Sequence, residues 1–199
     1  MKIGIIGTGN IGSAIARAMV RIGQDVTLAN RRGPAALDGL LEELGAKARA
    51  GTVEEAAKAD IVFVAVNWSK IPEALAGLEN WSGRIVVDAN NPIEAPAFRS
   101  FDLGGRSSSE VFSDFVPGAK VVKAFNHLQP HLLSGDPRAE GGQRVLFLAG
   151  DDAQAKANVS QLISRLGFAA VDLGSLAQGG RLTQFPGGPL PTLNLVKFD

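Results

Sequence analysis

The first residues with the types and spacing to do chemistry lie near the start of the chain. They form a G-x-G-x-x-G motif made of Gly7, Thr8, Gly9, Asn10, Ile11 and Gly12. The apolar run Lys2–Gly7 precedes it, and Ile11, Ile15, Met19 and Ile22 follow at helical spacing. In such a strand–loop–helix unit, the three glycines permit a tight turn, close approach of a pyrophosphate, and close helix–sheet packing. The loop therefore predicts a dinucleotide site, with a glycine-rich turn that binds nothing as the alternative.

The second chemical signal is the sequence Asn30, Arg31, Arg32, at the end of the run Asp25–Asn30. A site for NAD usually has a carboxylate there, which accepts a hydrogen bond from the ribose 2′-hydroxyl. Here an amide and two guanidinium groups take its place, and arginine can bind a 2′-phosphate through paired, charge-assisted hydrogen bonds. The segment favours NADP(H) over NAD(H). The alternative is that both arginines are solvated surface charges.

Three further candidates follow apolar runs that should end at the same edge of a sheet. Asn67 and Trp68 come after Ile61–Val66, and Asn91 comes after Arg84–Asp88. Trp68 is either a wall of the dinucleotide site or an ordinary, partly buried aromatic residue. Asn91 is a candidate to bond the nicotinamide carboxamide or a ribose hydroxyl, although a polar turn explains it as well.

His127 and His131 are the two histidines of the chain. His127 is a candidate to contact a substrate ring or to donate a proton; the alternative is a histidine at a helix start with no catalytic role. Two histidines without a third ligand make a poor metal site, so we expect no metal. The chain has no tyrosine, which excludes a Tyr–Lys dyad, and shows no Ser–His–Asp pattern. These absences fit a hydride transfer between rings, which depends mainly on proximity and orientation.

The elements that must position these residues alternate between strand and helix patterns. We expect strands over Lys2–Gly7, Asp25–Asn30, Ile61–Val66, Arg84–Asp88, Lys120–Phe125, Arg144–Ala149 and Phe168–Leu173. We expect helices over residues 11–22, over Pro34–Leu44, and after Asp151 or Asp152. This order predicts an α/β fold, with a doubly wound, mostly parallel sheet of the Rossmann NAD(P)-binding type and its ligand at the carboxyl ends of the strands. We divide the chain into a Rossmann domain over residues 1–173 and a Gly/Pro-rich C-terminal segment over 174–199 that packs near the site.

The composition narrows the class of protein. The 199 residues include 20 basic and 20 acidic ones, and this balance argues against a nucleic-acid partner. The chain has no cysteine, which excludes disulfides and thiolate chemistry. No apolar stretch is long enough to span a membrane, and the N-terminal apolar run is too short for a secretory signal. We therefore expect a cytoplasmic protein with a small-molecule substrate.

Taken together, these motifs resemble the F420-dependent NADP oxidoreductase family, which includes F420H2:NADP⁺ oxidoreductases and, more distantly, the reductase domain of the STEAP metalloreductases. The likeness rests on the glycine loop, on Asn30–Arg32, on Asn67 and Trp68, on Val121–Asn126 and on Leu148–Asp152. The resemblance implies that NADPH lies across the strand ends. It further implies that a deazaflavin (F420) or a flavin stacks on the nicotinamide, and that the protein is a homodimer. The glycine-rich tail from Gly179 departs from the more helical ending of those enzymes, which helps to form their deazaflavin pocket.

The resulting functional prediction is an NADPH-dependent oxidoreductase that transfers hydride between NADP(H) and F420 or a flavin-type acceptor. Two alternatives stay open. One is a regulatory or redox-sensing module that binds NADP(H) without turnover. The other is a reductase of a small carbonyl or imine compound.

Overall fold

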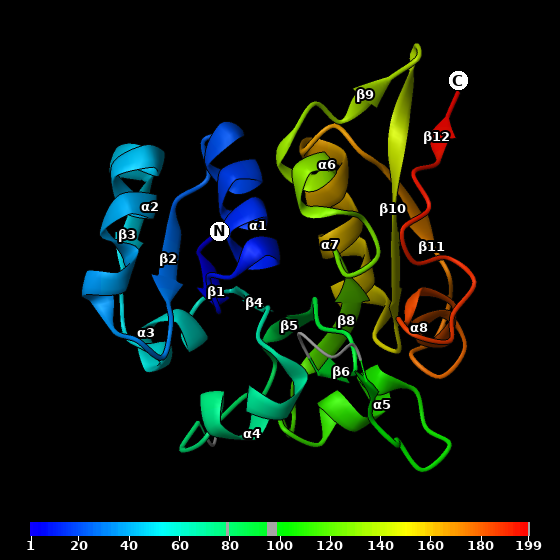
Figure 1. Ribbon diagram of the computed structural model, residues 1–199, viewed down its shortest axis with the longest axis horizontal. Coiled ribbons are helices and arrows are strands. Elements are labelled where there is room, and N and C mark those ends of the chain that lie inside the picture. Colours follow the sequence, from blue (N-terminus) through cyan, green and yellow to red (C-terminus); the bar gives the residue numbers. More distant parts are fainter. Residues whose placement is uncertain (79, 95–98, 199) are drawn as a thin grey trace.

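A single twisted sheet forms the centre of the molecule (Figure 1). The computed structural model describes residues 1–78, 80–94 and 99–198. Along the sheet the strands run in the order β11-β10-β8-β5-β4-β1-β2-β3. In chain order they are β1 (Ile3–Ile6), β2 (Val26–Ala29), β3 (Ala48–Ala50), β4 (Ile61–Val64), β5 (Ile85–Asp88), β8 (Lys120–Ala124), β10 (Gly142–Gly150) and β11 (Ala169–Asp172).

The sheet is mostly parallel, as predicted. Strands β3, β2, β1, β4, β5 and β8 pair in parallel with their neighbours, and β10 pairs in parallel with β11. Strand β10, however, runs antiparallel to β8. The prediction of a mostly parallel sheet allows for such a strand, although it did not say which strand would be reversed. The connection contains only the short helix α6 (Pro130–Ser134) and the edge strand β9 (Arg138–Ala139), and a parallel crossover usually needs a longer helix.

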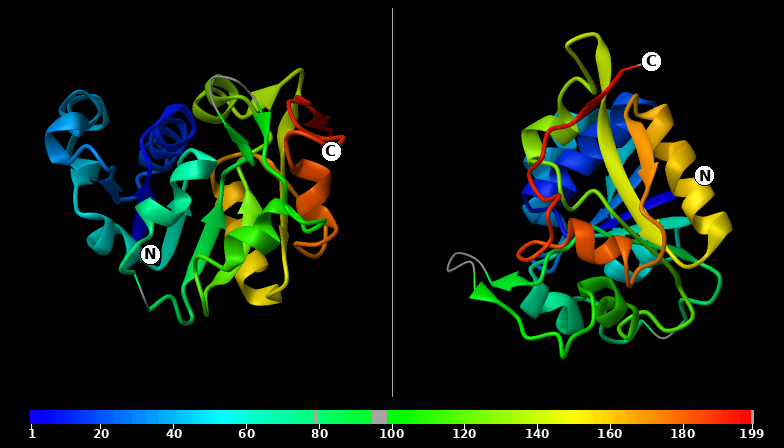
Figure 2. Two further views of the ribbon diagram at one scale, coloured as in Figure 1. Left: turned by 60° about the horizontal axis from the view of Figure 1, so that its bottom comes forward. Right: turned by 90° about the vertical axis from the view of Figure 1, so that its right-hand side faces the viewer.

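Helices cover both faces of the sheet (Figure 2). One apolar cluster joins residues of α1 (Asn10–Arg21), α2 (Asp38–Leu44), α6 and α7 (Ala153–Arg165) to one face of the strands. A second cluster joins α3 (Val53–Ala57), α4 (Ile71–Ala74) and α5 (Ser108–Ser113) to the other. Strand β4 shows why the layers form: Ile61 and Phe63 belong to the first cluster, whereas Val62 and Val64 belong to the second. A strand buried on both faces must be apolar at every position.

Most predicted element boundaries agree with the structure to within two residues. The helix predicted over Pro34–Leu44 has the predicted outer bounds, but its first part is the 3-10 turn η1 (Pro34–Leu37), which continues into α2. Asp152 caps α7, as its side chain accepts a hydrogen bond from the backbone N–H of Ala155 at 2.8 Å. The remaining short elements are the 3-10 turns η2 (Gly45–Lys47) and η3 (Trp68–Lys70), helix α8 (Gly179–Thr183), the strand pair β6 (Ile93–Glu94) and β7 (Arg99–Ser100), and strand β12 (Val196–Lys197).

The C-terminal segment lies against the last strands of the sheet. Strand β12 pairs antiparallel with β10, and Leu190 packs beside Val145 and Phe147 of that strand. In Figure 1 this segment, coloured orange to red, leaves α8 and runs beside β10 to the C-terminus, at the end of the sheet where β10 begins. Within the described ranges no helix is long and apolar enough to cross a membrane.

Candidate functional site

The three glycines of the N-terminal loop differ in the space that surrounds them. Gly7 has a φ of +97°, and a Cβ atom there would lie 2.3 Å from the carbonyl oxygen of Ala65. A Cβ atom on Gly12 would lie 1.8 Å from the carbonyl oxygen of Gly7. A Cβ atom on Gly9, by contrast, would meet nothing within 4 Å. Packing therefore requires Gly7 and Gly12, whereas the space over Gly9 is open for a ligand.

The start of α1 has polar groups that fit a bound anion and sugar. Gly9 is the N-cap of α1, no side chain caps the first turn, and that turn holds no acidic residue. The side-chain amide of Asn30 donates to the Thr8 hydroxyl at 3.1 Å, which ties the end of β2 to the glycine loop. The Oδ1 atom of Asn30 is buried and has no hydrogen-bond partner. A hydroxyl donor from a ligand would satisfy it.

The two arginines after β2 have different surroundings. The guanidinium group of Arg31 contacts the carboxylate of Glu73 at 2.6 Å, and Lys70 approaches the same carboxylate at 3.7 Å. These contacts link the end of β2 to helix α4, and they lower the pKa of Glu73, chiefly through the hydrogen bond from Arg31. Arg32 instead lines a cavity of about 670 Å³ beside the glycine loop. We call it the cationic cavity; its lining is Thr8, Gly9, Asn10, Ser13, Ala14, Arg17, Arg32, Pro130, His131 and Ser134.

A second cavity, of about 430 Å³, lies at the carboxyl ends of β4, β5 and β8. We call it the neutral cavity. Its lining is Gly9, Asn10, Ile11, Ala65, Val66, Asn67, Trp68, Ala89, Asn90, Asn91, Ile93, Asn126, His127, Leu128, Gln129, Pro130, Phe185, Pro191 and Thr192. Most of the predicted site residues meet here or at the cationic cavity. His127 and His131 line different cavities, and only His131 lies on helix α6.

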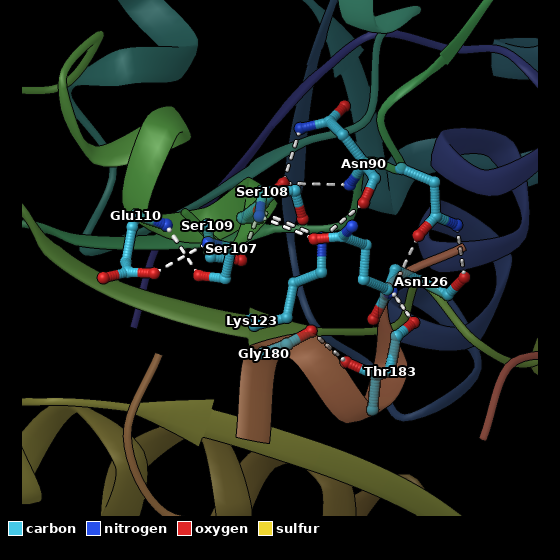
Figure 3. Close-up of polar contacts among 12 residues, drawn as sticks. Asn90, Ser107, Ser108, Ser109, Glu110, Lys123, Asn126, Gly180 and Thr183 are labelled. Carbon is cyan, nitrogen blue, oxygen red and sulfur yellow. Dashed lines mark hydrogen bonds and ion pairs between the residues drawn. The ribbon is translucent and has the colours of Figure 1, made fainter. Parts of the chain in front are cut away.

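A buried ion pair lies among the polar contacts below the neutral cavity. The ammonium group of Lys123 contacts the carboxylate of Asp88 at 3.0 Å, and both side chains are 0% exposed. Ser109 donates to the same carboxylate at 2.8 Å. Burial lowers the pKa of Lys123, and Asp88 opposes this shift. Figure 3 shows Lys123 beside Asn90 in this layer.

Asn90 connects the ion pair to the neutral cavity. Its side-chain amide donates to Asp88 at 2.8 Å, and its Oδ1 atom accepts from the backbone N–H of Val66 at 2.8 Å. Its carbonyl oxygen also accepts a hydrogen bond from Lys123. The groups of Asn90 are thus engaged within the protein, and it fixes the end of β4 where Asn67 and Trp68 begin.

Asn91 and Asn126 join the sheet to the C-terminal segment. Asn91 donates to the Asn126 carbonyl at 2.9 Å, and Asn126 donates to Asn91 Oδ1 at 3.0 Å. The same Oδ1 atom accepts from the N–H of Phe185 at 3.0 Å, and Asn126 donates to the Thr183 carbonyl at 2.7 Å. Asn91 was a predicted site residue, whereas Asn126 had no predicted role, because the partners of both come from a loop that no short motif identifies. The Oδ1 atom of Asn126 is buried without a partner.

The bend after β8 places His127 in the wall of the cavity. Phe125 has a φ of +64°, which is uncommon for a bulky residue, and packs edge-on against Phe63 at 5.3 Å. The ring of His127 lies 4.8 Å from that of Phe147, and neither ring nitrogen has a hydrogen-bond partner. Burial lowers the pKa of His127 to about 4, and the backbone of Val145 opposes this only in part. The imidazole is therefore neutral at pH 7.

Comparisons with known proteins agree with this geometry. The family described as NADP oxidoreductase, coenzyme F420-dependent, matches residues 2–92. A solved structure from Arthrobacter sp. FB24, provisionally named an F420-dependent NADP reductase, is 32% identical with a TM-score of 0.76, and the match covers 88% of this chain and 86% of that one. This chain belongs to the F420-dependent NADP oxidoreductase family. It is thus a member of a family of NADP-dependent oxidoreductases, as the sequence motifs indicated.

Two further relatives extend the comparison. A hypothetical protein from Sinorhizobium meliloti is 47% identical with a TM-score of 0.93, and the match covers 100% of this chain and 97% of that one. The metalloreductase STEAP3 of Rattus norvegicus is 31% identical over 192 residues, which are 96% of this chain and 37% of that protein. The chain thus spans little more than a third of the length of the curated relatives that it matches.

Proposed function

We propose that the protein binds NADPH across the glycine loop and transfers its hydride to a planar ring acceptor of the deazaflavin (F420) or flavin type. The observation that supports this most directly is the open space over Gly9, between a cavity with two arginines and a cavity with none. Membership of the family supports the same reading. In this proposal the pyrophosphate lies over Gly9, at the N-terminus of α1.

The two ends of the dinucleotide would then lie on opposite sides of the loop. The 2′-phosphate would bind near Thr8 and Arg32, with Arg31 at the rim, because these groups donate hydrogen bonds to phosphate. The free Oδ1 atom of Asn30 would accept from a ribose hydroxyl. The nicotinamide would enter the neutral cavity beside Trp68, with Asn91 and Asn126 along its wall.

For this reaction the protein must orient the nicotinamide and the acceptor ring and exclude water from between them. One hydride leaves the nicotinamide, and that hydride and one proton from water reduce the acceptor ring. Among the described residues that line the neutral cavity, none is acidic or basic apart from the buried, neutral His127. His127 would therefore contact the ring as an uncharged group, and proximity would supply most of the rate.

Replacement of Gly9 by valine tests the binding site. A side chain would occupy the space needed by the pyrophosphate, so NADPH should bind at least about 100-fold more weakly, a loss of roughly 2.7 kcal/mol. Because the new Cβ atom meets nothing in the protein, the variant should fold normally. Gly39→Val is the matched control, since Gly39 is also in open space but on α2. Unchanged NADPH affinity in folded Gly9→Val, measured by calorimetric titration, would rule out this assignment.

Turnover tests the second half of the proposal. NADPH carrying deuterium at one face of nicotinamide C4 should pass its label to C5 of a deazaflavin, where it does not exchange with water. A panel of F420, FMN, FAD and a quinone would identify the acceptor. The uncharged lining also suits a second candidate, a module that binds NADP(H) without turnover. Tight NADPH binding with no oxidation by any member of the panel would favour that module.

The homodimer, the cytoplasmic location and the division of the chain at residue 173 stay predictions. Light scattering on the purified protein would test the first, and fractionation of the source cells the second. A variant truncated after residue 173 would test the third, since a separate segment should leave a folded Rossmann domain.

A further inference from the structure

The neutral cavity is free of ionised side chains. None of the described residues in its lining is Lys, Arg, Asp or Glu. Its polar groups are amides, chiefly Asn91, Asn126 and Gln129, together with the imidazole of His127. Its apolar surface comes mainly from Trp68, Ile93, Leu128 and Phe185. An acceptor in this cavity would therefore meet hydrogen-bonding groups and apolar surface, but no counter-charge.

The charges that lie below the cavity compensate one another. Lys123 and Asp88 form a pair at 3.0 Å that is fully buried, and Ser109 completes the shell of the carboxylate. Asn90 lies between this pair and the cavity and uses its own groups to hold both partners. The pair is neutral as a unit, because a cation and an anion in contact cancel most of the field that either would exert on a ligand.

The same chain closes the cavity on its outer side. The N–H of Phe185 donates to Asn91 at 3.0 Å, and the N–H of Thr192 donates to the His127 carbonyl at 2.7 Å. Phe185 is 37% exposed, which places an aromatic ring at the edge of the cavity and partly in water. The C-terminal segment therefore adds apolar surface and peptide groups to the cavity, and no charge.

We infer that this cavity selects a hydride acceptor whose reacting ring system is planar and uncharged, and that it discriminates against rings bearing a carboxylate, phosphate or sulfonate. This rests on the proposed function and specifies its substrate. An anion moved from water into a site without a counter-charge loses solvation that nothing replaces. A neutral ring with carbonyl and N–H groups loses little, because the unpartnered Oδ1 atom of Asn126 can accept a hydrogen bond and the amide of Gln129 can donate and accept. Ionised tails are allowed only where they remain in water, beyond Phe185.

A matched pair of acceptors tests this inference: 1,4-naphthoquinone and its 2-sulfonate. Binding of each is measured on the complex with tetrahydro-NADPH, whose nicotinamide ring is uncharged and cannot donate a hydride, so that the cofactor adds no cation to the cavity. It is followed by quenching of tryptophan fluorescence, since Trp68 lines the cavity. We expect the neutral quinone to bind at least about tenfold more tightly than the sulfonate. Equal affinities, or tighter binding of the sulfonate, would overturn the inference.

Gln129 offers a change that should reverse the preference. It is exposed, precedes α6 and lines the cavity, so lysine at this position brings a cation to the rim without burying it. Gln129→Lys should improve binding of the sulfonate relative to the quinone by about five- to tenfold. The neutral control Gln129→Met should leave this ratio unchanged, and a ratio that moves equally in both variants contradicts the inference. Turnover is recorded separately: binding selectivity without NADPH oxidation would refute the proposed reaction while supporting the selectivity of the cavity.

Discussion

The two cavities on either side of the glycine loop share Gly9, Asn10 and Pro130 but differ in charge. The cationic cavity, of about 670 Å³, is lined by Arg17 and Arg32. The neutral cavity, of about 430 Å³, has no ionised side chain among the described residues of its lining. The difference suggests that the loop separates two kinds of recognition, of an anion on one side and of an uncharged ring on the other.

The origin of the difference lies in the elements that form each wall. Helix α1 and the end of β2 face water and carry long basic side chains. The neutral cavity is formed where β4, β5 and β8 end, and a charge there would be buried. The charges closest to it, on Asp88 and Lys123, are paired. Substitutions can therefore disturb one cavity at a time.

The largest effect is expected from the pair below the neutral cavity. Lys123→Met would leave the Asp88 carboxylate buried without its cation and should destabilise the protein by about 3–5 kcal/mol. The double variant Asp88→Asn, Lys123→Met removes both charges and should recover most of this loss. The control is Lys120→Met on the same strand, whose ion pair with Asp152 at 3.1 Å is partly exposed, so that its loss should cost far less stability. Urea unfolding gives the free energy of unfolding of each variant. If Lys123→Met is as stable as Lys120→Met, Lys123 does not neutralise the buried carboxylate of Asp88.

The next effect is a dependence of stability on pH that arises at His127. Its pKa is about 4 in the folded protein and 6.5 as the ordinary value. Between these values the unfolded chain binds a proton that the folded protein does not, so stability falls as the pH falls. The full difference is about 3 kcal/mol, present above pH 6.5 and lost by pH 4. His127→Gln should remove this part of the acid destabilisation, whereas His131→Gln, at the cationic cavity, should retain it. Parallel curves for wild type and His127→Gln would show that the imidazole is not held neutral by burial.

Much of the fold could be predicted from local patterns. Strand β4 is apolar at each position because it is buried on both faces, and a run of that kind is visible in the sequence. Helices α3 and α5 were missed although their capping boxes, Thr52 with Glu55 and Ser107 with Glu110, are also visible. These helices have five and six residues, too few to show a helical period. The direction of β10 depends on how a connection packs, which local pattern does not express.

The candidate site, like the fold, has one part that the sequence could predict and another part that it could not. The glycine loop could be found because three glycines at fixed spacing meet local backbone requirements. The partners of Asn91 could not, since Asn126 and Phe185 lie 35 and 94 residues further along the chain. Glu73 was missed for the same reason: its contact with Arg31 spans 42 residues and depends on where α4 packs.

A smaller change is expected from the arginines of the cationic side. Losing one charged hydrogen bond to the 2′-phosphate costs about 1.5–3 kcal/mol, so loss of one arginine contact should weaken NADPH binding roughly 10- to 150-fold. Arg31→Ala with Arg32→Ala should bring the affinities for NADPH and NADH close together. NADH affinity should hardly change, and adding Asn30→Asp should tilt preference towards NADH. Arg32→Ala alone should account for most of the loss of NADPH affinity, because Arg31 is already paired with Glu73. Arg165→Ala, exposed in the last turn of α7, is the control. The measurement is the ratio of the dissociation constants for NADPH and NADH. If the wild type prefers NADH, or if removal of both arginines leaves this ratio unchanged, the arginines are surface charges that do not bind the cofactor.

The smallest effect concerns the competition of Glu73 with a phosphate for Arg31. Their side chains are 65% and 50% exposed and 2.6 Å apart, and such exposed pairs are weak because water screens the two charges. Glu73→Gln should therefore raise NADPH affinity by up to about fivefold and leave NADH affinity unchanged. The gain should shrink as salt rises, because ions screen exposed charges. Asp114→Asn, which breaks an exposed pair with Arg106 at 2.7 Å, is a matched control away from both cavities.

The decisive measurement is a double-mutant cycle. In the Arg31→Ala background, Glu73→Gln should leave NADPH affinity unchanged, because the Glu73 carboxylate then has no arginine to compete for. An equal gain in both backgrounds would mean that Glu73 repels the phosphate directly, and that Arg31 does not contact it.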